Sequence, residues 1–217
     1  MTIHHSISIC VQAGNAMQTE GLVTQALKEN HLPSDILREG LAAGITEMKK
    51  KFYRNEILAS HVIIAERAMK AGLQILMSQI KKSQSTLLGT VIIGTLEGDI
   101  RETEKDIISV MMLSLGLKVI DLGPSISNTR FVEAAIKEKA QLIVCTTSLT
   151  IFLPQMESLV LAASQADIRQ RTKILLSGGP VTELFCKNIE ADLYAPDPLR
   201  AAEMAAEYCG KKMRNEE

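Results

Sequence analysis

The sequence is short of aromatic side chains and of excess positive charge. It has no tryptophan, aromatic residues make up 3% of the chain, and the formal net charge is −1. Few aromatic side chains are therefore available to stack on bases, and no excess of positive charge is available to bind phosphates. We do not expect a nucleic-acid partner. With 13 glycines and 6 prolines in 217 residues, a fibrous or linker-rich protein is also excluded.

Cysteine and long apolar runs are scarce as well. The four cysteines (Cys10, Cys145, Cys186 and Cys209) form no Cys-x-x-Cys pair, which argues against a zinc knuckle or a dithiol redox site. The apolar stretch 140–153 is too short to cross a membrane, and the first ten residues lack the features of a signal peptide. We therefore expect a protein of the reducing cytoplasm with no membrane partner.

The rest of the composition, 46% apolar and 23% charged, is typical of a folded globular protein. The character of the chain changes near residue 85. Residues 1–85 carry net positive charge and helical apolar spacing, whereas residues 86–217 carry net negative charge and alternate between two kinds of pattern. We therefore predict a helical domain over 1–85 and an α/β domain over 86–217.

The first domain shows apolar residues three or four positions apart throughout. The spacing predicts a short helix before Gly14, one over about 15–30, and two longer helices that begin at the N-caps Ser34 and Asn55. These helices would form a four-helix bundle, and the polar stretch 79–86 would link it to the second domain.

The second domain alternates β-rich runs with amphipathic stretches, which predicts βαβ units and a parallel sheet. The five expected strands are 87–94, 117–122, 141–146, 173–176 and 192–195. The expected helices lie near 103–115, 128–139, 155–167 and 181–189, with a last one from about 199. Right-handed crossovers make a doubly wound, Rossmann-like (flavodoxin-like) sheet the simplest arrangement.

Sheets of this kind bind ligands beyond the carboxyl ends of their strands. The chain has no GxGxxG after the first strand and no GxxxxGK[ST], which disfavours the usual dinucleotide and nucleoside-triphosphate sites. The strand ends instead read GTLEGDIRETEKD, CTTSLT, SGGP and YAPD. Each alone is an ordinary turn or helix cap, but at one sheet edge together they predict a groove for a long neutral ligand.

Seven stretches carry a resemblance to a known family. In order they are ILREGLAAGITEMKKKF, ERAMKAGLQIL, VIIGTLEGDI, LKVIDLGPSIS, FVEAAIKEKAQLIV, GGPVTE and ADLYAPD. The chain resembles, over nearly its whole length, the corrinoid proteins of methyltransferase systems. The resemblance implies a helical bundle followed by a five-stranded cobalamin-binding domain.

The same resemblance implies a cofactor and partners. The cofactor would be cobalamin, a cobalt corrinoid. A substrate:corrinoid methyltransferase would load a methyl group, a methyl-acceptor methyltransferase would remove it, and a reductive activase would restore the cofactor. The chain would then be the corrinoid subunit of such a system rather than a complete enzyme.

The resemblance also assigns residues to the cofactor. The nucleotide tail would thread between the first and fourth strands, and the corrin ring would lie over the strand ends. The helical domain would cover the upper corrin face with Phe52 and the helix from Ile57 to Met69. The full set is Gly98, Asp99, Ile100, Arg101, Glu104, Thr146, Thr147, Ser148, Thr150, Gly178, Gly179, Pro180, Tyr194, Ala195, Phe52 and His61.

One departure concerns the lower cobalt ligand. Family members carry Asp-x-His-x-x-Gly after the first strand, in which the histidine binds cobalt and the aspartate hydrogen-bonds the far ring nitrogen. Here Asp99 is retained, but Arg101 and Glu104 occupy the histidine and glycine positions. Arginine stays protonated and has no lone pair for a metal. The Ser-x-Leu element of the family is also altered, reading Thr-Thr-Ser at 146–148.

Three consequences stay open: cobalamin bound without a lower protein ligand, a different corrinoid or tetrapyrrole, or no cofactor in a degenerate paralogue. We favour the first, because most of the expected groove residues are retained. A cobalt without a lower nitrogen donor is easier to reduce, which suits a carrier or a sensor. The alternatives to a carrier are a cobalamin or tetrapyrrole sensor and a non-catalytic paralogue that scaffolds a methyltransferase.

His61 is the remaining candidate for the metal, since the resemblance places its helix over the corrin. A lone helical histidine is more often a polar packing residue than a ligand, and no second donor at ligand spacing accompanies it. We therefore predict no definite metal ligand, with His61 as an upper ligand only in the oxidised cofactor.

Overall fold

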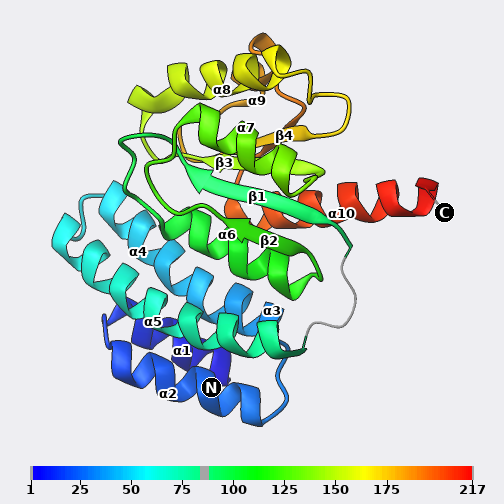
Figure 1. Cartoon of the computed structure of the whole chain (residues 1–217). Helices are drawn as coiled ribbons and strands as arrows, with labels where there is room; N and C mark the ends of the chain where they lie inside the picture. Colours follow the sequence, from blue (N-terminus) through cyan, green and yellow to red (C-terminus); the bar gives the residue numbers. More distant parts are fainter. Residues whose placement is uncertain (1, 84–87, 217) are drawn as a thin grey trace. The chain divides into compact units, whose positions relative to one another are not determined.

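The computed structural model describes residues 2–83 and 88–216 (Figure 1). The chain forms two compact units, Met1–Gln84 and Ser85–Glu217.

The first unit is helical. Its elements are α1 (Ile3–Gln12), α2 (Ala16–Lys28), α3 (Pro33–Asp35), the π-helical η1 (Ile36–Ala42), α4 (Ala43–Tyr53) and α5 (Ala59–Ser83). The segments α3, η1 and α4 follow one another without a break, so four helical rods pack together. The core of the unit consists of side chains at the predicted helical spacing, among them Ile7, Val11, Val23, Leu37, Leu41, Ile45, Met69, Leu73 and Leu76.

The prediction of Ser34 as an N-cap is wrong. The helix begins one residue earlier, with Pro33 in its first position and Leu32 as the capping residue, and no side chain caps it. Proline suits the first position of a helix because its φ is fixed near the helical value and its missing N–H would have no partner there. Ser34 therefore lies inside the first turn.

The prediction of Asn55 as an N-cap is wrong as well, because Asn55 ends α4. It has φ +58, its N–H donates to Phe52 O, and Glu56 N–H donates to Lys51 O. This pair of bonds around a left-handed residue is the Schellman arrangement, which asparagine tolerates better than most residues. The next helix, α5, begins at Ala59 and continues to Ser83. The predicted linker is thus helical from residue 79 to 83, and residues 84–86 of it lie outside the described residues.

The second unit is a parallel five-stranded sheet with the strand order β2-β1-β3-β4-β5. The strands are β1 (Thr90–Thr95), β2 (Lys118–Asp121), β3 (Leu142–Thr146), β4 (Lys173–Ser177) and β5 (Leu193–Ala195). The helices are α6 (Thr103–Ser114), α7 (Asn128–Lys137), α8 (Leu153–Gln165) after a 3-10 turn η2 (Thr150–Phe152), α9 (Glu183–Asn188) and α10 (Pro198–Glu216). The predicted fold class is confirmed. The first strand is shifted: Leu88 and Gly89 precede it, and residue 87 lies outside the described residues.

Helices cover both faces of this sheet, which is why its strands are rich in valine, isoleucine and leucine. Figure 1 shows α7, α8 and α9 on one side and α6 and α10 on the other. On the first side, Ile143, Cys145 and Leu176 pack with Phe131 and Met156 in one buried cluster. Because successive strand residues point to opposite faces, their neighbours along each strand point toward α6 and α10.

Within residues 2–83 and 88–216, no helix is long and apolar enough to cross a membrane.

Candidate functional site

Three central strands end in hydroxyl side chains that lie next to one another. Thr95 of β1 is the register partner of Thr146 of β3, which is in turn the partner of Ser177 of β4. Residues in register in a parallel sheet point to the same face, here the one covered by α6 and α10. We call Thr95, Thr146 and Ser177 the hydroxyl row. Ala195 continues it on β5 as the register partner of Ser177.

The loop after β1 is fixed by a buried carboxylate. Asp99 is 1% exposed; its Oδ2 accepts from the Thr147 hydroxyl at 2.7 Å, and its Oδ1 accepts from the Arg101 N–H at 3.1 Å. The Thr95 hydroxyl donates to the backbone oxygen of Asp99 and accepts from the N–H of Ser125. The ends of β1 and β3 are therefore joined through Asp99, and its position is set before any ligand binds.

The side chains that follow Asp99 point outward. Ile100 is 78% exposed, and Arg101 is exposed. Among the described residues, no ion pair involves the guanidinium of Arg101. A protonated guanidinium offers only donors, so Arg101 is able to bind an acceptor such as an amide oxygen or a phosphate but not a metal.

Glu104 lies in the first turn of α6 and reaches the hydroxyl row. Its Oε2 is 3.3 Å from the hydroxyl oxygen of Thr146, which donates to it. Thr146 is 1% exposed, so this contact brings a carboxylate to a buried position at the end of β3.

Lys105, the next residue of α6, is 2% exposed and surrounded by carboxylates. Its Nζ lies 2.6 Å from Asp121 and 2.8 Å from Asp106, with Glu102 at 3.6 Å. Burial alone lowers the pKa of a lysine, but the hydrogen bonds and charges of Asp106 and Asp121 outweigh it and raise the pKa of Lys105 above its usual value. The first turn of α6 is thereby tied to the end of β2.

We expect Lys105→Met to lower the free energy of unfolding by about 2 kcal/mol at neutral pH, because the carboxylates of Asp106 and Asp121 then lose the buried ammonium that binds them both. Since the folded pKa is raised, this stabilisation is present below the unfolded pKa of about 10.4 and is lost as the pH rises through the folded value. Urea unfolding from pH 7 to 11 should therefore show a steeper loss in the parent than in the variant above that pH.

Lys187→Met is the matched control for this prediction, because Lys187 is a surface residue with a 70% exposed side chain. It should leave the unfolding curve unchanged. Equal stability of Lys105→Met and the parent at neutral pH would contradict the assigned role.

The two glycines after β4 have different surroundings. Gly178 has φ +126, and a Cβ on it would lie 1.9 Å from the backbone oxygen of Thr147, so this position holds the two loops in close backbone contact. Gly179 is exposed, and a Cβ on it would meet no heavy atom within 4 Å. Only Gly179 thus borders space that a ligand is able to enter.

The structure does not place all predicted tail residues on one face. Tyr194 is the register partner of Leu176 and packs against the same buried cluster. Its side chain therefore points to the face of α7, α8 and α9, opposite to Thr146 and Ser177, because strand residues alternate. Ser148 and Pro180 are partly exposed, and Thr150 is exposed at the start of η2.

Phe52 and His61 belong to the helical unit. Phe52 is 39% exposed, next to the ring of Tyr53. His61 is exposed, and its Nδ1 accepts from the N–H of Leu58 at 3.2 Å, so it helps to close the turn before α5. No group of three or more potential metal-binding side chains occurs in the part of the chain that the structure describes.

The cysteines take no part in the site. All four are free and buried. Burial, together with the charge of Asp99, raises the pKa of Cys145, and burial and the charge of Glu183 raise that of Cys186 to about 11. Both are neutral thiols at physiological pH, whereas a nucleophile or a metal ligand requires the thiolate.

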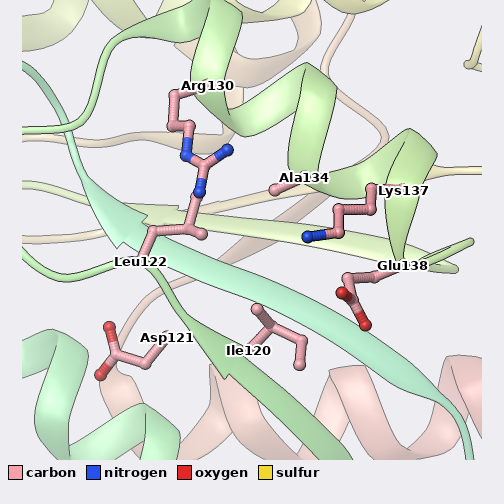
Figure 2. A pocket seen from close by; sticks show the side chains of 7 residues that line it. All are labelled: Ile120, Asp121, Leu122, Arg130, Ala134, Lys137 and Glu138. Carbon is pink, nitrogen blue, oxygen red and sulfur yellow. The ribbon is translucent and has the colours of Figure 1, made fainter.

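Figure 2 shows a pocket of about 320 Å³ between β2 and α7. Its lining residues are Ile120, Asp121, Leu122, Arg130, Ala134, Lys137 and Glu138. None of these belongs to the predicted cofactor set. Its charged members are two cations of α7, Arg130 and Lys137, and two carboxylates, Asp121 and Glu138.

The residues at the edge of the sheet fit the tail of a corrinoid. The Ser177 hydroxyl is fully buried and has no hydrogen-bond partner among the described residues, which leaves a donor and an acceptor for a ligand. Ser177 is the last residue of β4, two positions before the exposed Gly179. Thr95 and Ser177 lie within the strand-end stretches named above but were not among the predicted cofactor residues. The only signal for them was a hydroxyl at the last position of each strand.

Comparison with known proteins shows the family to which the chain belongs. Residues 3–77 match one family described as a B12 binding domain, and residues 89–203 match a second family with the same description. The chain therefore belongs to the corrinoid-binding proteins that combine these two domains, and its cofactor is a cobalamin-type corrinoid, as predicted.

Two individual proteins and one solved structure are similar to most of the chain. The chain is 33% identical to the trimethylamine corrinoid protein of Methanosarcina barkeri over 177 residues, 81% of this chain and 82% of the relative. It is 32% identical to the dimethylamine corrinoid protein of the same organism over 186 residues, 85% and 87% of the two chains. The solved structure of the M. barkeri monomethylamine corrinoid protein superposes with a TM-score of 0.82 at 26% identity and covers 94% of this chain and 97% of that one.

Proposed function

We propose that the protein is a corrinoid carrier that shuttles a methyl group between a substrate:corrinoid methyltransferase and a methyl-acceptor methyltransferase, with a reductive activase as a third partner. The relatives support this role, because they are named as corrinoid proteins of trimethylamine and dimethylamine and are matched over most of their length. The bound corrinoid supplies a cobalt centre that accepts and releases the methyl group. A reducing cytoplasm suits the four free cysteines.

We further propose that the cobalt has no histidine ligand from the α/β unit. The observation that carries this proposal is that all four histidines, His4, His5, His31 and His61, precede that unit in the sequence. The position where the resemblance expects the ligand is Arg101, which has no lone pair for a metal.

The environment of Asp99 supports the same proposal. Both of its carboxylate oxygens already accept hydrogen bonds, one from the Thr147 hydroxyl and one from the N–H of Arg101. In this arrangement Asp99 holds the loop after β1 against β3, and it does so without a histidine. Phe52 and His61 stay predicted contacts of the upper corrin face.

Reconstitution tests the binding part of the proposal. The purified protein is mixed with hydroxocobalamin, desalted and examined by its visible spectrum. We expect about one corrinoid per chain to remain, and a colourless protein would contradict the proposal. Transfer of the methyl group from a methylated donor to an acceptor, in the presence of the two partner methyltransferases, then separates a carrier from a sensor.

A further inference from the structure

Glu104 brings negative charge to a row of otherwise neutral side chains. Its Oε2 accepts from the Thr146 hydroxyl at 3.3 Å, and Thr146 is the middle member of the hydroxyl row. The neighbouring Ser177 hydroxyl has no partner among the residues that the structure describes. Of the neighbouring hydroxyls of Ser177 and Thr146, the first is therefore ready for a ligand and the second is engaged by Glu104.

The position of Glu104 is held by the residue after it. Lys105 is buried and bound to Asp121 at the end of β2 and to Asp106 on its own helix. Rotation of the first turn of α6, which would carry Glu104 away from Thr146, would also pull the ammonium of Lys105 from these carboxylates. Glu104 therefore faces the row as part of a fixed helix start, and the N-terminal end of a helix favours its negative charge.

The tail of a complete cobalamin carries a phosphodiester with one negative charge, whereas cobinamide lacks the nucleotide and this charge. A carboxylate in a partly buried position repels a like charge, and it occupies the Thr146 hydroxyl that the tail would otherwise use. We propose that Glu104 determines corrinoid specificity by weakening the binding of corrinoids with an anionic nucleotide tail relative to cobinamide. This inference rests on the proposed corrinoid-binding function.

Two variants and two corrinoids test the inference. Aquocobinamide and hydroxocobalamin are titrated into the apo forms of the parent, Glu104→Ala and Glu104→Gln, and the dissociation constants are measured by calorimetry. We expect Glu104→Ala to bind hydroxocobalamin about tenfold more tightly, because one competing hydrogen bond and one like charge are removed. Glu104→Gln should gain less, since it keeps an acceptor for Thr146, and cobinamide binding should change less than about twofold.

Glu133→Ala is the matched control. Glu133 lies on α7 with a 62% exposed side chain, and this substitution removes one negative charge at a position outside the hydroxyl row. It should leave both constants unchanged. An unchanged ratio of the two constants in both Glu104 variants overturns the inference while the proposed function stands. Failure of parent and variants to bind either corrinoid overturns the proposed function and the inference with it.

Discussion

Replacing Gly179 by leucine is expected to abolish corrinoid retention and to leave the fold intact. Gly179 is exposed, and the space beside it is open, so the larger side chain meets no protein atom at its Cβ. It would instead fill the open space beside Gly179, where we propose that the cofactor tail binds, and we expect the affinity to fall on the order of 100-fold. Desalting after reconstitution with hydroxocobalamin measures the loss, and circular dichroism checks the fold.

Gly178→Ala is the matched counterpart and should act on stability. A Cβ at Gly178 would overlap the backbone oxygen of Thr147, and φ +126 is strained for any other residue. We expect a loss of about 3 kcal/mol or more in the free energy of unfolding, measured in urea. Retention of cofactor by Gly179→Leu, or a Gly178→Ala protein as stable as the parent, would show that the roles of the two glycines are assigned wrongly.

Replacing Arg101 by histidine is expected to create an axial nitrogen ligand. Asp99 stands two residues before position 101. Its carboxylate oxygens accept from the Thr147 hydroxyl and from the N–H of residue 101, and each has a second lone pair with which to orient an imidazole. The electron paramagnetic resonance spectrum of bound cob(II)alamin should gain nitrogen superhyperfine splitting. Glu104→Gly is the second substitution to add if the loop needs a closer approach.

Arg101→Ala is the control for this change, because it removes the guanidinium without supplying a nitrogen donor. Its spectrum should match that of the parent. A histidine variant that binds cobalamin without nitrogen splitting, alone and with Glu104→Gly, would mean that the loop after β1 does not approach the lower face of the cobalt.

The fold could be predicted from the sequence because its signals are local. The change from helical spacing to alternating β-rich runs near residue 85 is visible in the composition of each segment. The two N-cap predictions were wrong because two local signals compete at each place. Ser34 is a good N-cap residue, but Pro33 takes the first helical position. Asn55 is also a good N-cap residue, but it adopts the left-handed conformation that ends α4.

The site was only partly predictable because it depends on register between strands far apart in the sequence. That Thr95, Thr146 and Ser177 form one row follows from the pairing of β1, β3 and β4, which no single segment encodes. The side of the sheet that Tyr194 faces depends on the same register. The burial of Lys105 is likewise non-local, because its strongest partner, Asp121, ends another strand.

The most direct test of the central claim is the electron paramagnetic resonance spectrum of the parent protein reconstituted with cobalamin and reduced to cob(II)alamin. Because residue 101 is an arginine and the α/β unit contains no histidine, we expect a spectrum without nitrogen superhyperfine splitting. Splitting that disappears in His61→Ala would assign the nitrogen to the helical unit, and it would contradict the expectation that His61 does not bind the reduced cobalt. Splitting that persists in His61→Ala would mean that the cofactor's own base stays on the cobalt, and this result would contradict the buried tail as well.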